Sequence, residues 1–140
     1  MSNETNFDPT WHVRVGLNHV GAYQVSGRPF AKAVGDTQTG SDPIQVEFPY
    51  VTRWVQIINN DTDNAVKVAF SVRGLATESN YFRIGKASAA SLPTASERLE
   101  LKVSSLYFTG STDVDIVAGL TSIEPTKVKT SDGENWSGSA

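Results

Sequence analysis

The strongest constraint on the fold is an alternation of apolar and polar residues with a period of two. Residues 65–72, AVKVAFSV, place four apolar side chains on one side of an extended chain, and residues 98–103 and 113–118 repeat the pattern. Such alternation is typical of β-strands with one buried and one solvated face. Helical signals are poor. Residues 85–96 are rich in serine and contain Pro93, so we expect a long loop there.

The same pattern continues along most of the chain and predicts an all-β fold with about eight strands. They are expected at residues 11–15, 22–25, 44–48, 51–58, 65–72, 80–84, 97–108 and 113–120, with a bend of the 97–108 strand considered at Ser104–Ser105. Short strands at regular spacing favour a β-sandwich or a barrel. A chain of 140 residues can bury its own core. We therefore expect one β-sandwich domain over residues 1–140, with a core at about 11–124 and polar arms at about 1–9 and 125–140.

Residues 48–60, FPYVTRWVQIINN, differ from the other expected strands because both sides are mostly apolar. This is typical of a strand that is covered on both faces. Parity places Arg53 on the same side as Val55 and Ile57, and it places Trp54 on the opposite side as an expected core anchor. Arg53 must then meet a carboxylate, extend past a sheet edge or contact another subunit.

Composition excludes several classes of protein. There is no cysteine, which rules out disulfides, thiolate metal sites and cysteine nucleophiles. The net charge is −3 and there is no basic block, so binding to nucleic acid is disfavoured. We expect no signal peptide, because no basic segment precedes an apolar run, and no membrane span. Charged residues make up only 19 % of the chain, which is low for a free-standing soluble domain.

No catalytic or metal-binding constellation stands out. His12 and His19 have no carboxylate beside them at ligand spacing, so we expect no metal site there. The loop containing Asn60, Asp61 and Asp63 resembles a cation-binding loop but lacks the glycine and the final glutamate of an EF-hand. An ordinary turn stabilised by the Asp and Asn side chains is favoured, with a bound ion as the alternative. We predict that the protein is not an enzyme and needs no cofactor.

Aromatic residues near strand ends are the remaining candidates for recognition. Tyr23, Tyr50 and Tyr81 are surface candidates, because a flat row of aromatic rings can stack on sugars. The more common role of such residues is to anchor a core or a subunit interface. Trp136 is isolated in a polar tail, which favours burial against a partner or against its own domain.

Several segments together resemble one family of viral proteins. The segments are GLNHVGAYQVSGRPF, VEFPYVTRWVQIINN, LELKVSSLYFTGS with VDIVAGLTSI, and NWSGSA. The chain resembles, over about residues 16–138, the small single jelly-roll capsid proteins of large icosahedral double-stranded DNA viruses and marine phages. These are proteins of the penton (vertex) or minor capsid kind. The resemblance implies an eight-stranded jelly roll made of two four-stranded sheets, with five copies around each five-fold axis.

The resemblance also implies a function, partners and a location. We expect a virion structural protein that is made in the host cell cytoplasm and assembles with copies of itself, as a pentamer, and with neighbouring major and minor capsid proteins. Arg28, Phe30, Arg53 and Trp136 are the candidate interface residues. A capsid decoration (cement) protein and a carbohydrate- or receptor-binding β-sandwich module are the alternatives.

Overall fold

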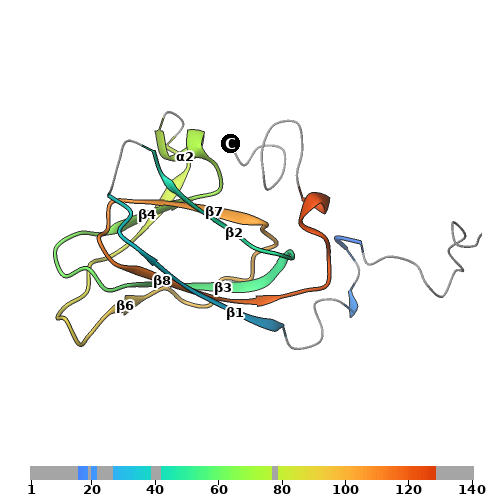
Figure 1. Ribbon diagram of the computed structural model, residues 1–140, viewed down its shortest axis with the longest axis horizontal. Helices are drawn as coiled ribbons and strands as arrows, with labels where there is room; N and C mark the ends of the chain where they lie inside the picture. The colour runs from blue at the N-terminus through green and yellow to red at the C-terminus, as the bar shows by residue number, and fades with distance from the viewer. Residues whose placement is uncertain (1–15, 19, 22–26, 39–41, 77–78, 129–140) are drawn as a thin grey trace, which may run out of the picture.

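The computed structural model describes residues 16–18, 20–21, 27–38, 42–76 and 79–128, and these form two antiparallel four-stranded sheets packed face to face (Figure 1). The β1 sheet has the strand order β1 (Arg28–Gly35), β8 (Val114–Leu120), β3 (Thr52–Asn59) and β6 (Thr94–Ala95). The β2 sheet has the order β2 (Ile44–Glu47), β7 (Ser105–Thr109), β4 (Val66–Ala69) and β5 (Tyr81–Ile84). A short helix, α2 (Val72–Ala76), and a 3-10 turn, η2 (Pro125–Lys127), complete the described elements. The predicted all-β sandwich is confirmed.

Strand pairing follows a simple order along the chain. β1 pairs with β8, β2 with β7, β3 with β6, and β4 with β5, all antiparallel. The chain therefore runs as one long antiparallel hairpin that folds back on itself between β4 and β5. Successive pairs of this hairpin lie alternately in the β1 sheet and the β2 sheet. The pairings of β3 with β8 and of β4 with β7 join the pairs within each sheet.

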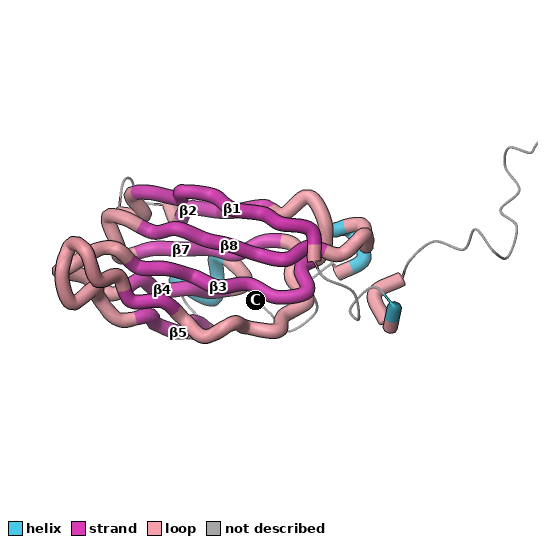
Figure 2. The backbone as a smooth tube through the Cα atoms, turned by 90° about the horizontal axis from the view of Figure 1, so that it is seen from below, coloured by secondary structure: helices cyan, strands magenta, loops and turns pink. Residues whose placement is uncertain are grey.

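The core lies between the two sheets and is built from the alternating residues of their strands. The first residues of β8 alternate between buried and half-buried, as the period of two predicts, whereas four consecutive residues of β7, Ser105 to Phe108, are all buried. The largest fully buried side chains of the cluster are Phe108, Ile57, Leu106 and Ile116. Seen from the side of the β1 sheet, β1, β8 and β3 lie side by side and no described helix covers them (Figure 2). The outer face of the β2 sheet carries α2.

Several strand predictions agree with the structure and several do not. The strands expected at 44–48, 51–58, 80–84 and 113–120 are confirmed within one residue or so. The strand expected at 65–72 ends at Ala69, because the chain leaves the sheet and enters α2. β1 was not expected: its exposed alanines and lysine hide the period of two. The strands expected at 11–15 and 22–25 lie outside the described residues.

The strand expected at 97–108 is confirmed only from Ser105 onward, just after the bend considered at Ser104–Ser105. Only Ser105–Thr109 is a strand of the β2 sheet. The preceding chain instead runs along the outer edge of β3: β6 pairs with Ile58 and Asn59, and hydrogen bonds join Leu99 to Val55 and Val103 to Thr52. The polar segment 85–96, expected to be a loop, thus ends in the edge strand β6. We call residues 94–103 the β3-edge segment.

The expected boundary of the C-terminal arm at residue 125 is too early. Pro125–Lys127 form η2, and Val128 is buried with Val51 and Ile123 in a second, smaller apolar cluster. Residues 125–128 therefore belong to the packed body. The proposed arms at 1–9 and 129–140 lie outside the described residues.

Candidate interaction surfaces

A β-bulge in β3 decides where Arg53 lies. The register with β8 passes from Thr52 opposite Leu120 to Trp54 opposite Gly119, so Arg53 is an extra residue in β3. Thr52 is buried, whereas Arg53 and Trp54 are both half-buried. The parity that placed Arg53 on the buried face of Val55 and Ile57 is therefore wrong. The bulge removes the arginine from the core and keeps it near the surface.

Trp54 lies against a glycine on the outer side of the β1 sheet. Gly119 is opposite Pro29 of β1 on one side and opposite Trp54 of β3 on the other. A Cβ added to Gly119 would lie 2.3 Å from Nε1 of Trp54, so the indole occupies the space of the missing side chain. We call Pro29, Trp54 and Gly119 the Trp54 platform. Trp54 is thus a half-exposed outer residue, and the expectation of a core anchor is wrong.

Both arginines among the candidate interface residues lie close to this platform in the strand register. Arg28 is opposite Leu120, the neighbour of Gly119, and Arg53 is the bulge residue next to Trp54. The Arg28 guanidinium lies 4.8 Å from the centre of the Tyr50 ring, a cation–π distance. Arginine, tyrosine and tryptophan are the residue types that carry most binding energy at protein interfaces. The structure therefore brings Arg28, Tyr50 and Arg53 together at one end of the sandwich.

The other sequence candidates are separated from this group. Phe30 lies in β1 and packs against the main core, with its ring 5.1 Å from that of Phe48 in an edge-to-face contact. It is therefore part of the sandwich and not of an arm. Tyr81 lies in β5 of the β2 sheet, whereas Tyr50 lies in the connection between β2 and β3, outside both sheets. Tyr23 and Trp136 lie outside the described residues.

Tyr81 is held between two cations. The Lys67 Nζ and the Arg83 guanidinium each lie 5.1 Å from the centre of its ring. Arg83 also donates a hydrogen bond from Nη2 to the Tyr81 hydroxyl, at 3.0 Å. Lys67 and Arg83 were not singled out from the sequence. They lie in different strands, so only the strand register brings them together.

The opposite end of the sandwich is closed by a buried polar network. The Asn59 side chain is fully buried, and its Nδ2 donates to the carbonyls of Asn64 and Gly85, each at 3.0 Å. Its Oδ1 accepts from the Asp61 N–H at 3.1 Å and from the Ser111 hydroxyl at 2.7 Å. A single amide thus joins the ends of β3 and β5 to two loops, because it can donate and accept at once.

Asp61 extends this network into the loop formed by residues 60–64. Its carboxylate accepts hydrogen bonds from the backbone of Asp63 and Thr112 at 2.8 and 2.9 Å, and from the side chains of Asn64 and Thr112 at 3.1 and 3.0 Å. These donors, the backbone N–H of Asp63 foremost, hold the pKa of Asp61 well below its usual range. Both carboxylate oxygens are thus used by the fold, as in the Asx turn that the sequence predicts.

A pocket of about 460 Å³ lies beside the second apolar cluster. Its walls are mostly apolar, and its lining residues are Leu17, Phe70, Glu100, Leu101, Lys102, Val103 and Val128.

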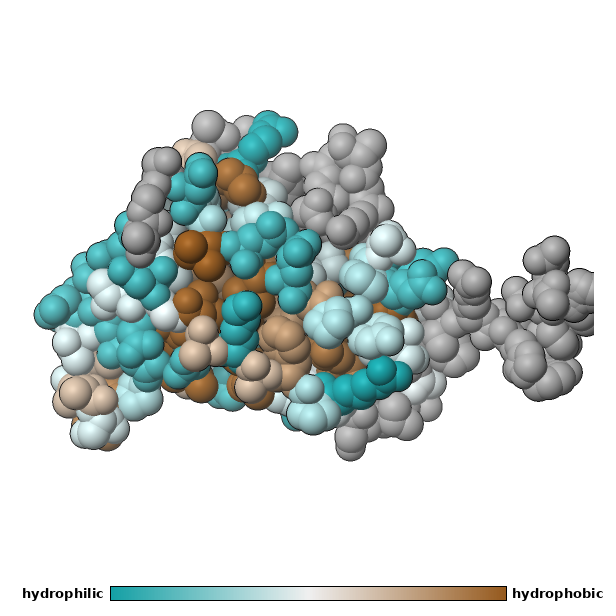
Figure 3. Space-filling model, viewed as in Figure 1, coloured by the Kyte–Doolittle hydropathy of each residue, from teal (hydrophilic) through white to brown (hydrophobic). Residues whose placement is uncertain are grey.

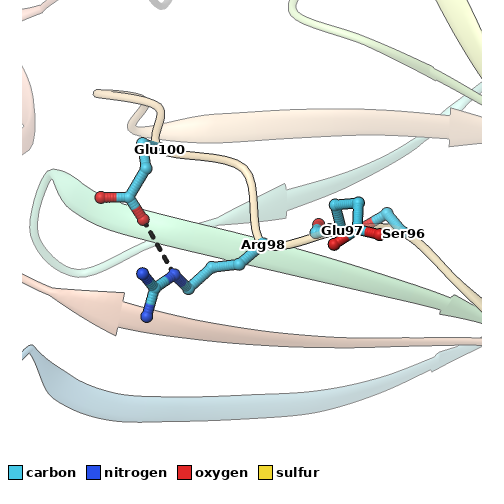
Figure 4. Close-up of polar contacts among 4 residues, drawn as sticks. All are labelled: Ser96, Glu97, Arg98 and Glu100. Atoms are coloured by element: carbon cyan, nitrogen blue, oxygen red, sulfur yellow. Dashed lines mark hydrogen bonds and ion pairs between the residues drawn. The ribbon is translucent and has the colours of Figure 1, made fainter.

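Glu100 forms an ion pair with Arg98 on the exposed surface, with 3.1 Å between the Arg98 Nε and the Glu100 Oε2 (Figure 4). Such an exposed pair contributes little stability. The space-filling view shows brown hydrophobic areas between teal hydrophilic side chains on one face of the molecule (Figure 3).

Comparisons with known proteins add no assignment to these surfaces. Among the described residues, no group of three or more histidine, aspartate or glutamate side chains could hold a metal ion. None of the described helices is long and apolar enough to cross a membrane. No family model matches the chain, and no curated protein or solved structure matches it.

Proposed function

We propose that this protein is a virion structural protein that forms a pentameric ring, the penton, at the five-fold vertices of an icosahedral capsid. The observation that carries the proposal is the strand pairing: a long antiparallel hairpin divided between two four-stranded sheets supports a single jelly roll. Jelly rolls form the domains of many viral capsids, and also of lectins and cupins. The resemblance of the chain to small capsid proteins favours the first of these.

A ring also needs two different surfaces on each copy. In a closed ring, one surface of a subunit contacts a different surface of the next. The β1 sheet offers two opposite edges for this purpose: β1 at one side, and the β3-edge segment at the other. Exposed Arg28 lies on β1, whereas exposed Glu97 lies on the β3-edge segment. We infer that these opposite charges set the order of subunits in the ring.

Charge exchange tests this arrangement. The full chain and its variants are analysed by sedimentation velocity, with R28E and E97K made separately and together. Each single variant should weaken the pentamer, and the double variant should recover much of it, because the pairing is restored with reversed sign. K86E, which changes a single exposed lysine outside both edges, should assemble like the unmodified chain.

Two outcomes would contradict the proposal. A chain that stays monomeric at high concentration and is absent from purified particles is not a capsid protein. Pentamers that survive both single variants would show that the two edges of the β1 sheet are not the contact surfaces. Electron microscopy of particles distinguishes a penton from a decoration protein, because a decoration protein would lie on the capsid faces and a penton at the vertices.

A further inference from the structure

Three side chains form a row across the outer face of the β2 sheet. Lys67 of β4 lies opposite Arg83 of β5 on one side and opposite Thr109 of β7 on the other. Residues that face each other across antiparallel strands lie on the same face of the sheet. Thr109, Lys67 and Arg83 therefore line up as a hydroxyl, an ammonium and a guanidinium, which we call the Lys67–Arg83 row.

The row departs from the usual chemistry of a sheet surface. Like charges directly opposite each other in a sheet are destabilising. Among the strand residues of this outer face the only acid is Glu47, which lies on the far edge strand β2, opposite Ser105. In the described part of the chain Lys67 and Arg83 contact the Tyr81 ring, and no carboxylate pairs with either of them. Two cations are thus concentrated at one point of a chain whose net charge is −3.

Tyr81 orients the two cations and does not neutralise them. The ring attracts each cation through its π face at 5.1 Å, and the Tyr81 hydroxyl accepts a hydrogen bond from Arg83. The ring carries no net charge, so the repulsion between the ammonium and the guanidinium persists. The two side chains are therefore held in place for a group that supplies negative charge and several hydrogen-bond acceptors.

We propose that the Lys67–Arg83 row binds a sulfate or phosphate group, either as a free ion or carried on a sugar. Such a group has several acceptor oxygens, which matches a guanidinium, an ammonium and a hydroxyl placed side by side. The proposal does not depend on the penton proposal, because the row lies on the β2 sheet, whereas the inferred ring contacts lie at the edges of the β1 sheet.

The test uses the full chain and a fluorescent, heparin-derived hexasaccharide as the probe. Binding is measured by fluorescence anisotropy for the unmodified chain, for K67Q/R83Q, and for K86Q/K127Q as the matched control. Both double variants lose two positive charges at half-buried or exposed positions, so they change the net charge equally. K67Q/R83Q should bind at least about tenfold more weakly, and the control should change less than about threefold, because only the row places two charged donors on one anion.

Further measurements identify the source of the anion and separate an effect on binding from an effect on folding. If a free ion is the ligand, sodium sulfate should displace the probe far better than sodium chloride at equal ionic strength. If a sulfated sugar is the ligand, a chemically desulfated hexasaccharide should fail to bind and free sulfate should compete weakly. Equal losses in both double variants, or unchanged binding in K67Q/R83Q, would refute the proposal. A lower melting temperature of K67Q/R83Q with unchanged binding would also refute it, because the two cations would then stabilise the fold without binding the anion.

Discussion

Replacing Gly119 with alanine tests the Trp54 platform directly. Gly119 is buried in β8, with β1 on one side and β3 on the other, so its backbone has no room to move. The new Cβ would lie 2.3 Å from Nε1 of Trp54 and 2.8 Å from Cε2, where ordinary contacts begin at 3.4 Å. The indole must therefore shift by about 1.1 Å or leave the β1 sheet. Gly27 also lies close to Gly119, because a Cβ added to Gly27 would lie 2.6 Å from the Cα of Gly119.

The cost follows from the kind of clash. Forcing an extra methyl group into a packed site typically costs about 1–3 kcal/mol. A domain of this size loses roughly 3–4 °C of melting temperature for each kcal/mol. G119A should therefore melt about 3–12 °C below the unmodified chain. If the indole turns outward, the lower part of this range applies, because the clash is relieved at the expense of the apolar contact of Trp54.

The assay combines calorimetry with fluorescence. Trp11 and Trp136 are replaced by phenylalanine so that Trp54 is the only tryptophan. G119A in this background should melt earlier and shift the Trp54 emission toward that of a solvated indole. G85A is the control, because a Cβ at Gly85 meets no atom within 4 Å. An unchanged melting temperature together with unchanged emission in G119A would refute the contact between Trp54 and Gly119, and with it the platform.

Three further predictions concern the polar end of the sandwich and one turn. N59A should lower the free energy of unfolding by about 3 kcal/mol in urea denaturation, because it leaves buried donors and carbonyls without partners. The native pKa of Asp61 is depressed, so its contribution is complete at neutral pH and is lost as the pH falls below about 4 toward the native pKa. D61N should therefore lack part of the acid-induced loss of stability seen in the unmodified chain; equal acid dependence would contradict this. G110A should melt several degrees lower, because Gly110 has a φ of 98° and an added Cβ would lie 3.0 Å from the Ala65 carbonyl oxygen.

The strand content could be predicted from the sequence wherever one face of a strand is buried and the other is wet. β5 and β8 follow this rule, and their alternation located both within one residue. The Asx turn at Asp61 was predictable for a similar reason, because it depends on neighbouring residues alone. Gly119 carried a usable signal as well: a glycine inside a strand pattern often marks a close approach of another group.

The elements that escaped prediction depend on residues far apart in the chain. β1 is an edge strand whose exposed alanines and lysine show no alternation, so only its pairing with β8 defines it. The bulge at Arg53 cannot be read from a periodic pattern, because it is a property of the register with β8. Lys67 and Arg83 are ordinary surface residues in the sequence and become a pair only when β4 and β5 align.

The two ends of the sandwich use their polar groups differently, and this difference bears on the proposed assembly. At the Asn59 end, buried donors and acceptors satisfy one another, and the Asp61 carboxylate is engaged by the chain itself. Such a network closes the sandwich and leaves little for a ligand to bind. At the Trp54 end, the half-buried indole of Trp54 lies against Gly119, Arg28 contacts the Tyr50 ring, and Arg53 is next to Trp54 in the chain. Because burial of Trp and Arg at an interface contributes the most binding energy, the assembly proposed above would use contacts at this end.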